Sequence, residues 1–194
     1  MDHIAKPAGE KWNSKYQEKE FLYGREPMLA LKNLLPELRP GKVIDIGMGE
    51  GRNAVYLAQK GFTVDGIDAS SVAIDRAKKL ALEKGVTVEA KVQNLDFFLM
   101  PLMKFDSVVM SYFRPQPRFF SEVRRGLVAG GTFLLEAYTT EHVRAHPNAG
   151  IELEECFKPN EILGHLKDFH ILYYRELLDG DAHTVQVLAR KNKA

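Results

Sequence analysis

Short apolar runs alternate with amphipathic stretches along nearly the whole chain. Seven runs have the length and residue types of strands: 43–46, 62–67, 86–92, 105–113, 132–137, 169–177 and 183–189. Several intervening segments place apolar residues at helical spacing or favour helix: 27–38, 53–59, 72–84, 119–127 and 160–167. Strands that alternate with helices predict an α/β fold with a largely parallel sheet. The turn residues 179–181 predict an antiparallel hairpin at the end of the chain.

The segment from Val43 to Asn53 organises this pattern. A short apolar run around Asp45 leads directly into glycines at positions 47, 49 and 51. Such a run, bounded by glycine on both sides, is typical of a buried parallel strand. Glycine lets the backbone turn sharply and approach a ligand, and helix-favouring residues follow from Asn53. The segment therefore predicts a strand, a glycine turn and a helix N-terminus that together bind a nucleotide-like ligand.

The spacing of the glycines narrows the choice of ligand. A dinucleotide fingerprint needs a glycine where the chain has Arg52, and no Lys-Ser/Thr pair follows as a phosphate-binding loop requires. The second apolar run ends in Asp68, about 20 residues after the first glycine, where an acid can accept hydrogen bonds from both ribose hydroxyls. A ribose without a pyrophosphate predicts S-adenosylmethionine (SAM). Asp45 needs a partner inside its apolar strand, which loop N–H groups or the SAM ammonium group can provide.

Composition narrows the class of protein. The 194 residues, 45% of them hydrophobic, fit a single domain over residues 1–194, and the net charge of +1 gives no general attraction to nucleic acid or membrane. The single cysteine, Cys156, excludes an internal disulfide framework and favours the cytoplasm. No apolar run reaches membrane-spanning length. Residues 1–10 follow no pattern and are expected to lack fixed structure.

These motifs resemble those of a known enzyme family. The segment 43–53 resembles motif I of the class I SAM-dependent methyltransferases, and its Gly-Glu-Gly-Arg-Asn ending is similar to the small tellurite-resistance/thiopurine methyltransferase-like branch. Trp12 with Tyr16, the stretches 23–27 and 135–139, and His183 with 185–187 extend the resemblance to roughly residues 11–191. It implies a Rossmann-like, seven-stranded, mostly parallel sheet with an antiparallel C-terminal strand and helices on both faces. It also implies an enzyme that uses SAM and releases S-adenosylhomocysteine (SAH).

The resemblance further implies which residues contact SAM. Arg52 either holds the SAM carboxylate, lines the substrate site or forms a surface ion pair. The N-terminal aromatics either cover the cofactor or pack as an ordinary surface helix. After the third strand an amide, Asn94, stands where the family often has an acid for adenine, with Asp96 as the alternative. The predicted set is Tyr16, Tyr23, Arg25, Asp45, Gly47, Gly49, Gly51, Arg52, Asn53, Asp68, Ala69, Asn94, Leu95 and Ser111.

The methyl acceptor is expected beyond the carboxyl ends of the strands. The residues expected near it are Tyr112, Arg114, Tyr138 and His183, none of them assigned as catalytic. A Phe-Arg-Pro segment replaces the His-Leu-Pro-like segment that the branch usually has, which puts family-typical chemistry in doubt there. His142 and His146 have the spacing of a metal-binding pair, but without a third ligand in register they are expected to be exposed and no metal is predicted.

The predicted function is methyl transfer from SAM to a small-molecule acceptor. A thiol or chalcogen anion fits, because a soft anion needs little help from a base and the chain has no general-base motif such as Asn-Pro-Pro-Tyr. One alternative is a SAM-binding regulatory or scaffold protein without turnover, which the altered segment 112–117 permits. A less favoured alternative is an NAD(P)-dependent oxidoreductase, which Arg52 disfavours. No nucleic-acid or membrane partner is expected, and the chain is expected to be a monomer or homodimer.

Overall fold

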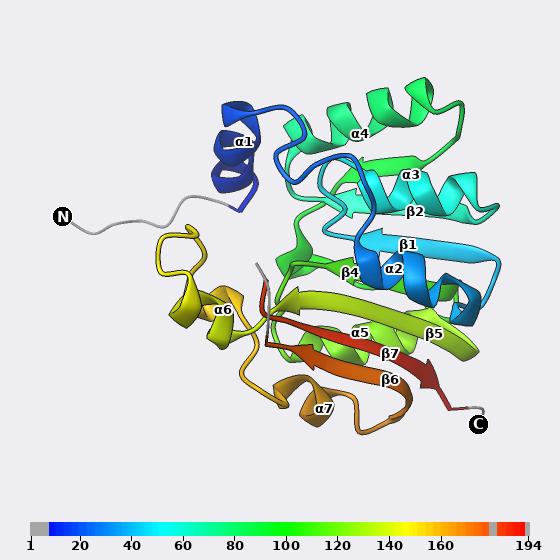
Figure 1. Ribbon diagram of the computed structural model, residues 1–194. Helices are drawn as coiled ribbons and strands as arrows, with labels where there is room; N and C mark the ends of the chain where they lie inside the picture. The colour runs from blue at the N-terminus through cyan, green and yellow to red at the C-terminus, as the bar shows by residue number, and fades with distance from the viewer. Residues whose placement is uncertain (1–7, 179–181, 193–194) are drawn as a thin grey trace. The chain divides into compact units, whose positions relative to one another are not determined.

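A computed structural model describes residues 8–178 and 182–192 (Figure 1). Its strands are β1 Lys42–Ile46, β2 Thr63–Asp68, β3 Glu89–Val92, β4 Phe105–Ser111, β5 Leu127–Tyr138, β6 Phe169–Leu177 and β7 Thr184–Lys191. They form a seven-stranded sheet in the order β3-β2-β1-β4-β5-β7-β6. β2–β3 and β4–β5 are parallel pairs, whereas β7 is antiparallel to both β5 and β6. The predicted Rossmann-like, mostly parallel sheet is confirmed.

The helices follow the predicted segments with a few differences. They are α1 Ala8–Glu18, α2 Leu29–Leu34, α3 Arg52–Gln59, α4 Ser71–Glu83, α5 Arg118–Gly126, α6 Thr140–Ala145 and α7 Glu161–His165, with short 3₁₀ turns at η1 Leu35–Glu37, η2 Leu95–Phe97 and η3 Leu153–Glu155. The helix predicted over 27–38 ends at Leu34, because Pro36 cannot donate the hydrogen bond that an α-helix needs there. Residues 8–10, expected to lack structure, belong to α1. The predicted turn at 179–181 lies outside the described residues.

Contacts divide the chain into two compact units. Unit 1 comprises the described residues of 1–27 and 44–99, and unit 2 comprises those of 28–43 and 100–194. Among the described residues no helix is both long and apolar enough to cross a membrane.

Unit 1 contains β2, β3, α3 and α4, with α1 beside the N-terminal end of α4 (Figure 1). Ser70 caps α4 by accepting a hydrogen bond from the backbone N–H of Ala73 at 3.1 Å. The same serine donates to the Asn13 side chain of α1 at 2.6 Å, and Asn13 also accepts from the backbone N–H of Val72 at 3.3 Å. Side-chain hydrogen bonds therefore tie α1 to the start of α4.

Unit 2 contains β4, β5, β6 and β7, which Figure 1 draws with β5, β7 and β6 as neighbouring arrows. β5 is buried over most of its length because it pairs with β4 and with β7. On α5 the apolar side chains of Phe119, Phe120 and Val123 are buried at helical spacing, and the last turn carries two arginines. This unit holds the residues expected near the methyl acceptor.

Candidate functional site

The glycine turn after β1 takes a backbone conformation that favours glycine. Gly47, Gly49 and Gly51 have φ values of 67°, 54° and 87°, in the left-handed region. The backbone N–H of Gly47 donates to the carbonyl of Ile67 at 2.9 Å, which fixes the turn against β2. A Cβ added to Gly49 would lie 2.7 Å from the hydroxyl of Tyr16, so the turn also needs glycine for space. The predicted glycine turn is therefore present, and α1 lies close to it.

Asp68 at the end of β2 holds the turn from the other side. Its Oδ2 accepts from the backbone N–H of Gly49 and its Oδ1 from that of Ser70, both at 2.9 Å. Burial raises the pKa of this carboxyl, while the N–H groups of Ser70, Gly49 and Ala69 lower it. Each carboxylate oxygen can accept a second hydrogen bond, so Asp68 can still receive hydroxyl donors from a ligand.

Asp45 lies within β1 and is completely buried. Neither of its carboxylate oxygens makes a hydrogen bond of normal geometry with any described residue. Burial and the nearby charge of Asp68 raise its pKa to about 7, against the opposing effects of Arg52 and the backbone N–H of Ala54. A buried carboxylate without a partner is costly, so this position fits a cationic or hydrogen-bond-donating ligand group.

Glu50, between two of the glycines, is a buried acid whose contacts the sequence analysis did not predict. Its carboxylate is 6% exposed and accepts from the backbone N–H groups of Phe21 and Leu22 at 2.8 and 2.7 Å. Arg76 of α4 donates to the same carboxylate and to the carbonyls of Tyr16 and Lys19. The turn, α4 and the N-terminal segment are thus joined through one ion pair. The only sequence signal was an acid inside a glycine-rich turn.

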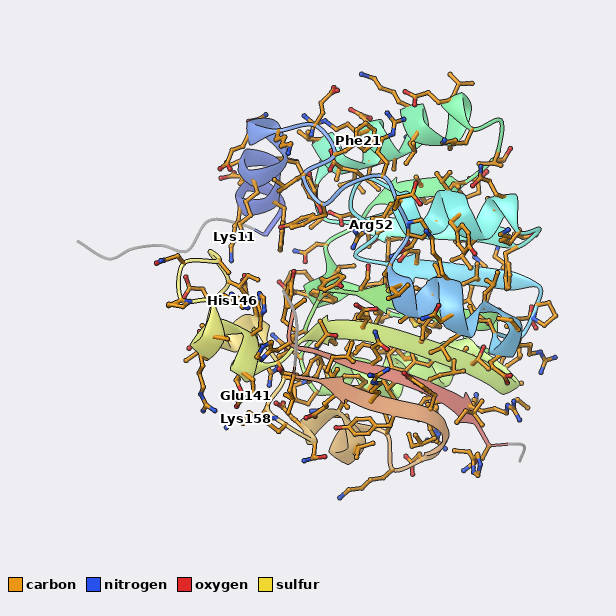
Figure 2. All side chains as sticks on the ribbon, in the orientation of Figure 1. Lys11, Phe21, Arg52, Glu141, His146 and Lys158 are labelled. Atoms are coloured by element: carbon orange, nitrogen blue, oxygen red, sulfur yellow. The ribbon has the colours of Figure 1, made fainter. Side chains whose placement is uncertain are left out.

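The N-terminal residues predicted to contact SAM lie along this segment. Tyr16 is buried and its ring meets that of Tyr23 edge-on at 6.2 Å, and burial raises the pKa of Tyr16. Arg52 donates to the carbonyl of Tyr23 at 2.6 Å. Arg25 instead lies 4.2 Å over the ring of Phe21 and pairs with Glu83 on α4. Figure 2 labels Phe21 and Arg52 in unit 1.

The two candidates for adenine recognition lie in and before η2. The Asn94 side chain accepts from the backbone N–H of Asp96 at 2.9 Å, which caps this short turn, and both residues are exposed. Leu95 follows Asn94 within η2 and is partly buried. The backbone N–H of Gln93 donates to the carbonyl of Asp68 at 2.8 Å, which links this segment to the end of β2. Asn94, Leu95 and Asp68 therefore belong to one connected edge of unit 1.

In unit 2, some of the residues expected near the methyl acceptor lie close together. Tyr112, directly after Ser111 and β4, has a left-handed φ of 52°, a strained conformation for a side chain of this size. Its hydroxyl donates to buried Glu136 at 2.6 Å, and its ring lies 4.8 Å from that of Tyr138. Arg114 lies elsewhere in the unit, paired with Glu161 at 2.5 Å, so it is not part of this group.

Two histidines expected to be exposed belong to the same group. His142 is 5% exposed and its ring stacks on Tyr138 with centroids 4.3 Å apart. His146 and His183 lie 4.8 and 6.3 Å from the His142 ring. The predicted exposure is wrong for His142, because its ring stacks on Tyr138 of β5, whereas His146 is partly buried. Among residues 8–178 and 182–192 no set of three or more potential ligands has an arrangement that could hold a metal ion.

Comparison with known proteins agrees with this geometry. Residues 43–131 match the family model described as "Methyltransferase domain". Residues 43–131 are therefore similar to a methyltransferase domain. An uncharacterised methyltransferase of Synechocystis is 38% identical over 114 residues, covering 55% of this chain and 51% of that protein. The ubiquinone biosynthesis O-methyltransferase of Actinobacillus pleuropneumoniae is 29% identical over 147 residues, covering 63% of this chain and 62% of that protein.

A solved structure agrees with this fold. TehB from Haemophilus influenzae superimposes with a TM-score of 0.71 at 19% identity, over 93% of this chain and 67% of that one. The chain spans less than two thirds of the length of the two curated relatives named above. Neither the matched family nor these relatives support the two alternatives, a scaffold without turnover and an NAD(P)-dependent oxidoreductase.

The cofactor of such a methyltransferase is SAM, and unit 1 has features that fit it. SAM carries an ammonium group, which suits the unpartnered and fully buried carboxylate of Asp45. Three left-handed glycines leave the backbone of the turn without side chains that would obstruct a ligand. The two carboxylate oxygens of Asp68 keep free acceptor capacity for ribose hydroxyls. The residues present are therefore compatible with SAM.

Proposed function

We propose that the chain binds SAM through unit 1 and transfers its methyl group to a small-molecule acceptor. The observation that carries this proposal is the unpartnered carboxylate of Asp45 at the foot of the left-handed glycine turn. A buried charge of this kind is retained where a ligand compensates it. A small acceptor is favoured over nucleic acid because the net charge is only +1.

Each cofactor-side residue has a proposed role. Asp45 pairs with the SAM ammonium group, Asp68 accepts from the ribose, and Arg52 pairs with the SAM carboxylate. Asn94 or Asp96 accepts from the adenine amino group, beside the backbone of Leu95. When bound, SAM supplies a methyl group on a positively charged sulfur, so the task of the protein is mainly to align the acceptor and exclude water.

Two acceptor classes have support. A thiol or chalcogen anion needs little base assistance, and the fold resemblance to TehB is consistent with that branch. A hydroxyl group is the second class, because one relative is named as an O-methyltransferase and unit 2 holds three clustered imidazoles. We further propose that the protein works in the cytoplasm as a monomer or homodimer.

Calorimetry with SAM and, separately, SAH tests the cofactor assignment. Micromolar binding of both is expected, and NADH is expected not to bind. Asp68→Asn should weaken binding at least about tenfold, because it weakens an acceptor that serves both turn and ribose. Asp75→Asn on the exposed face of α4 is the matched control. Absence of binding by both SAM and SAH would overturn the proposal.

Turnover is tested next, by SAH formation with thiols, selenite, tellurite and phenols as acceptors. Methylation of one class is the expected result. Cofactor binding without SAH formation for any of these acceptors would contradict the transfer step and favour a regulatory protein.

A further inference from the structure

Three histidines form a compact group in unit 2, which we call the imidazole cluster: His142 on α6, His146 directly after it and His183 directly before β7. Their ring centroids lie 4.8, 5.8 and 6.3 Å apart. Figure 2 labels His146 at the C-terminal end of α6 and Glu141 near its start. Two segments far apart in sequence therefore bring three weakly basic side chains together.

Hydrogen bonding within the cluster leaves two of its nitrogens without a partner. The backbone N–H of His183 donates to Nδ1 of His142 at 3.3 Å, so the proton of a neutral His142 is on Nε2. Nε2 of His146 and Nδ1 of His183 are buried, and each lacks a hydrogen-bond partner among the described residues. Buried polar atoms are almost always paired, so two such atoms in one cluster indicate a missing ligand group.

Aromatic rings on one side of the cluster indicate what shape this ligand has. Tyr138 stacks on His142 with ring planes 14° apart, and Tyr112 lies beside Tyr138 at 4.8 Å. Tyr112 is held there by its hydrogen bond to buried Glu136 and by a strained backbone. Stacked rings recognise flat, aromatic partners. Strained residues held by surrounding structure are concentrated at functional sites.

The charge of the surroundings indicates that the ligand is neutral. Burial, followed by the charges of His146 and His183, lowers the pKa of His142 and so disfavours a positive charge on this ring. The arginines that could attract an anion are engaged elsewhere, Arg144 with Glu141 and Arg114 with Glu161. The other titratable groups along this chain of contacts are the phenols of Tyr112 and Tyr138 and the carboxyl of Glu136.

We propose that the imidazole cluster binds the methyl acceptor as a neutral aromatic hydroxyl compound. One of the two unpartnered nitrogens, on His146 or His183, accepts the hydrogen bond from the hydroxyl and acts as the base, and the other carries a proton and donates to the hydroxyl oxygen. This inference rests on the function proposed above and names its substrate class. The acceptor O–H bond breaks and its proton passes to an imidazole nitrogen. The oxygen electron pair forms the bond to the methyl carbon, and the pair of the broken methyl–sulfur bond stays on sulfur. A phenol needs such a base at neutral pH, unlike a thiolate.

Binding of 4-nitrophenol to the SAH-loaded protein tests the proposal, because its absorbance distinguishes phenol from phenolate. We expect saturable binding in which the bound phenol ionises at higher pH than it does in free solution, because burial and a hydrogen-bond acceptor both favour the neutral phenol over the phenolate. The methyl ether 4-nitroanisole lacks the O–H group and should bind at least about tenfold more weakly. This comparison uses the unaltered protein, so it does not depend on how a variant folds. Equal binding of phenol and ether would overturn the proposal.

Variants assign the role to individual residues. His146→Gln and His183→Gln should each weaken 4-nitrophenol binding about tenfold and abolish the shift in its ionisation, whereas the exposed His170→Gln should change neither. SAH affinity measured on the same samples should stay unchanged. If both histidine variants still bind 4-nitrophenol as the unaltered protein does and still shift its ionisation, the inference is overturned, although the proposed SAM binding is not. Failure of the unaltered protein to bind SAH would instead refute the function on which the inference rests.

Discussion

The carboxylate of Glu50 lies 2.8 Å from the guanidinium of Arg76, and the two side chains are only 5% and 15% exposed. The pair joins the glycine turn to α4. Both partners also bind backbone groups of residues 16–22, Glu50 through two N–H groups and Arg76 through two carbonyls. This ion pair therefore helps to hold residues 16–22 of the N-terminal segment in place within unit 1.

Arg76→Met should destabilise the protein by about 3–5 kcal/mol, because it leaves the buried Glu50 carboxylate without its charged partner. Urea unfolding measures the loss, and hydrogen exchange should show reduced protection of the Phe21 and Leu22 amides. Arg25→Met is the control, since its pair with Glu83 is exposed and should contribute less than about 1 kcal/mol. Equal effects of the two substitutions would contradict the assigned role.

Asp45→Asn should make the cofactor-free protein more stable and its SAM binding weaker. The substitution removes a buried charge that has no hydrogen-bonded partner, but it buries an amide instead. The free energy of unfolding should therefore rise by about 2 kcal/mol above pH 7. SAM affinity should fall at least about tenfold, since the ammonium group loses its counter-charge. Urea unfolding and calorimetry on the same samples measure both effects. A variant that is less stable yet binds SAM normally would refute this role.

The stability difference between Asp45→Asn and the unaltered protein should depend on pH. The pKa of this carboxyl rises from 3.8 to about 7 on folding, so its ionisation opposes folding. The unaltered protein should therefore lose stability relative to the variant as pH rises from about 4 to about 7, with no further change above that. SAH affinity should increase more over the same interval in the unaltered protein than in the variant, in which Asp68 still titrates but Asp45 does not. Unfolding and binding series in steps of one pH unit provide the measurement.

Gly49→Ala should be more harmful than the same change at Gly85. Both glycines have left-handed φ values, 54° and 66°, so both substitutions carry a backbone cost of about 1–2 kcal/mol. Only at Gly49 does the new Cβ meet another atom, the Tyr16 hydroxyl at 2.7 Å, whereas nothing lies within 4 Å at Gly85. Adding Tyr16→Phe to Gly49→Ala should recover part of the extra loss in thermal unfolding. Equal losses at the two glycines would show that space is not the constraint.

Tyr112→Phe should destabilise the protein by about 1–3 kcal/mol, because Glu136 is 4% exposed and loses a 2.6 Å hydrogen bond. Tyr173→Phe is the control, since that hydroxyl makes a longer bond of 3.3 Å to Gln186 in a partly buried position. Chemical unfolding of both variants measures the difference. The assignment fails if the Tyr173 substitution costs as much.

The sequence predicted the part of unit 1 whose conformation is determined locally. The strand before Gly47, the glycine turn and Asp68 at the end of β2 all follow from periodicity, glycine spacing and strand length. The helix predicted from Asn53 to Gln59 agrees with α3, because the residues beside it in the sequence determine where it begins and ends. The proposed contacts of these residues with SAM remain predictions.

Other features depend on contacts between distant segments, which periodicity does not encode. Glu50 accepts hydrogen bonds from the backbone N–H groups of residues 21 and 22. Almost every residue type has such an N–H group, so the sequence does not show which residues Glu50 will contact. His142 and His146 have the spacing of an exposed helical pair, and only the ring of Tyr138 on β5 buries the first of them. The early end of α2 is different, because Pro36 ends the helix at a position that the sequence itself shows, although the leucine periodicity continues to Leu38.

The hydrogen bonds of Glu50 and Arg76 have a consequence for choosing where to cut the chain for expression. The segment that matches the family, residues 43–131, would lack the N–H groups of Phe21 and Leu22 and the carbonyls of Tyr16 and Lys19. It would also stop at Gly131, inside β5, before the residues that pair with β7 from Thr132 onward. A fragment defined by sequence similarity alone would therefore keep the glycine turn but lose the segments that hold it in place. The region by which the family is recognised is shorter than the region that an expression plasmid must encode.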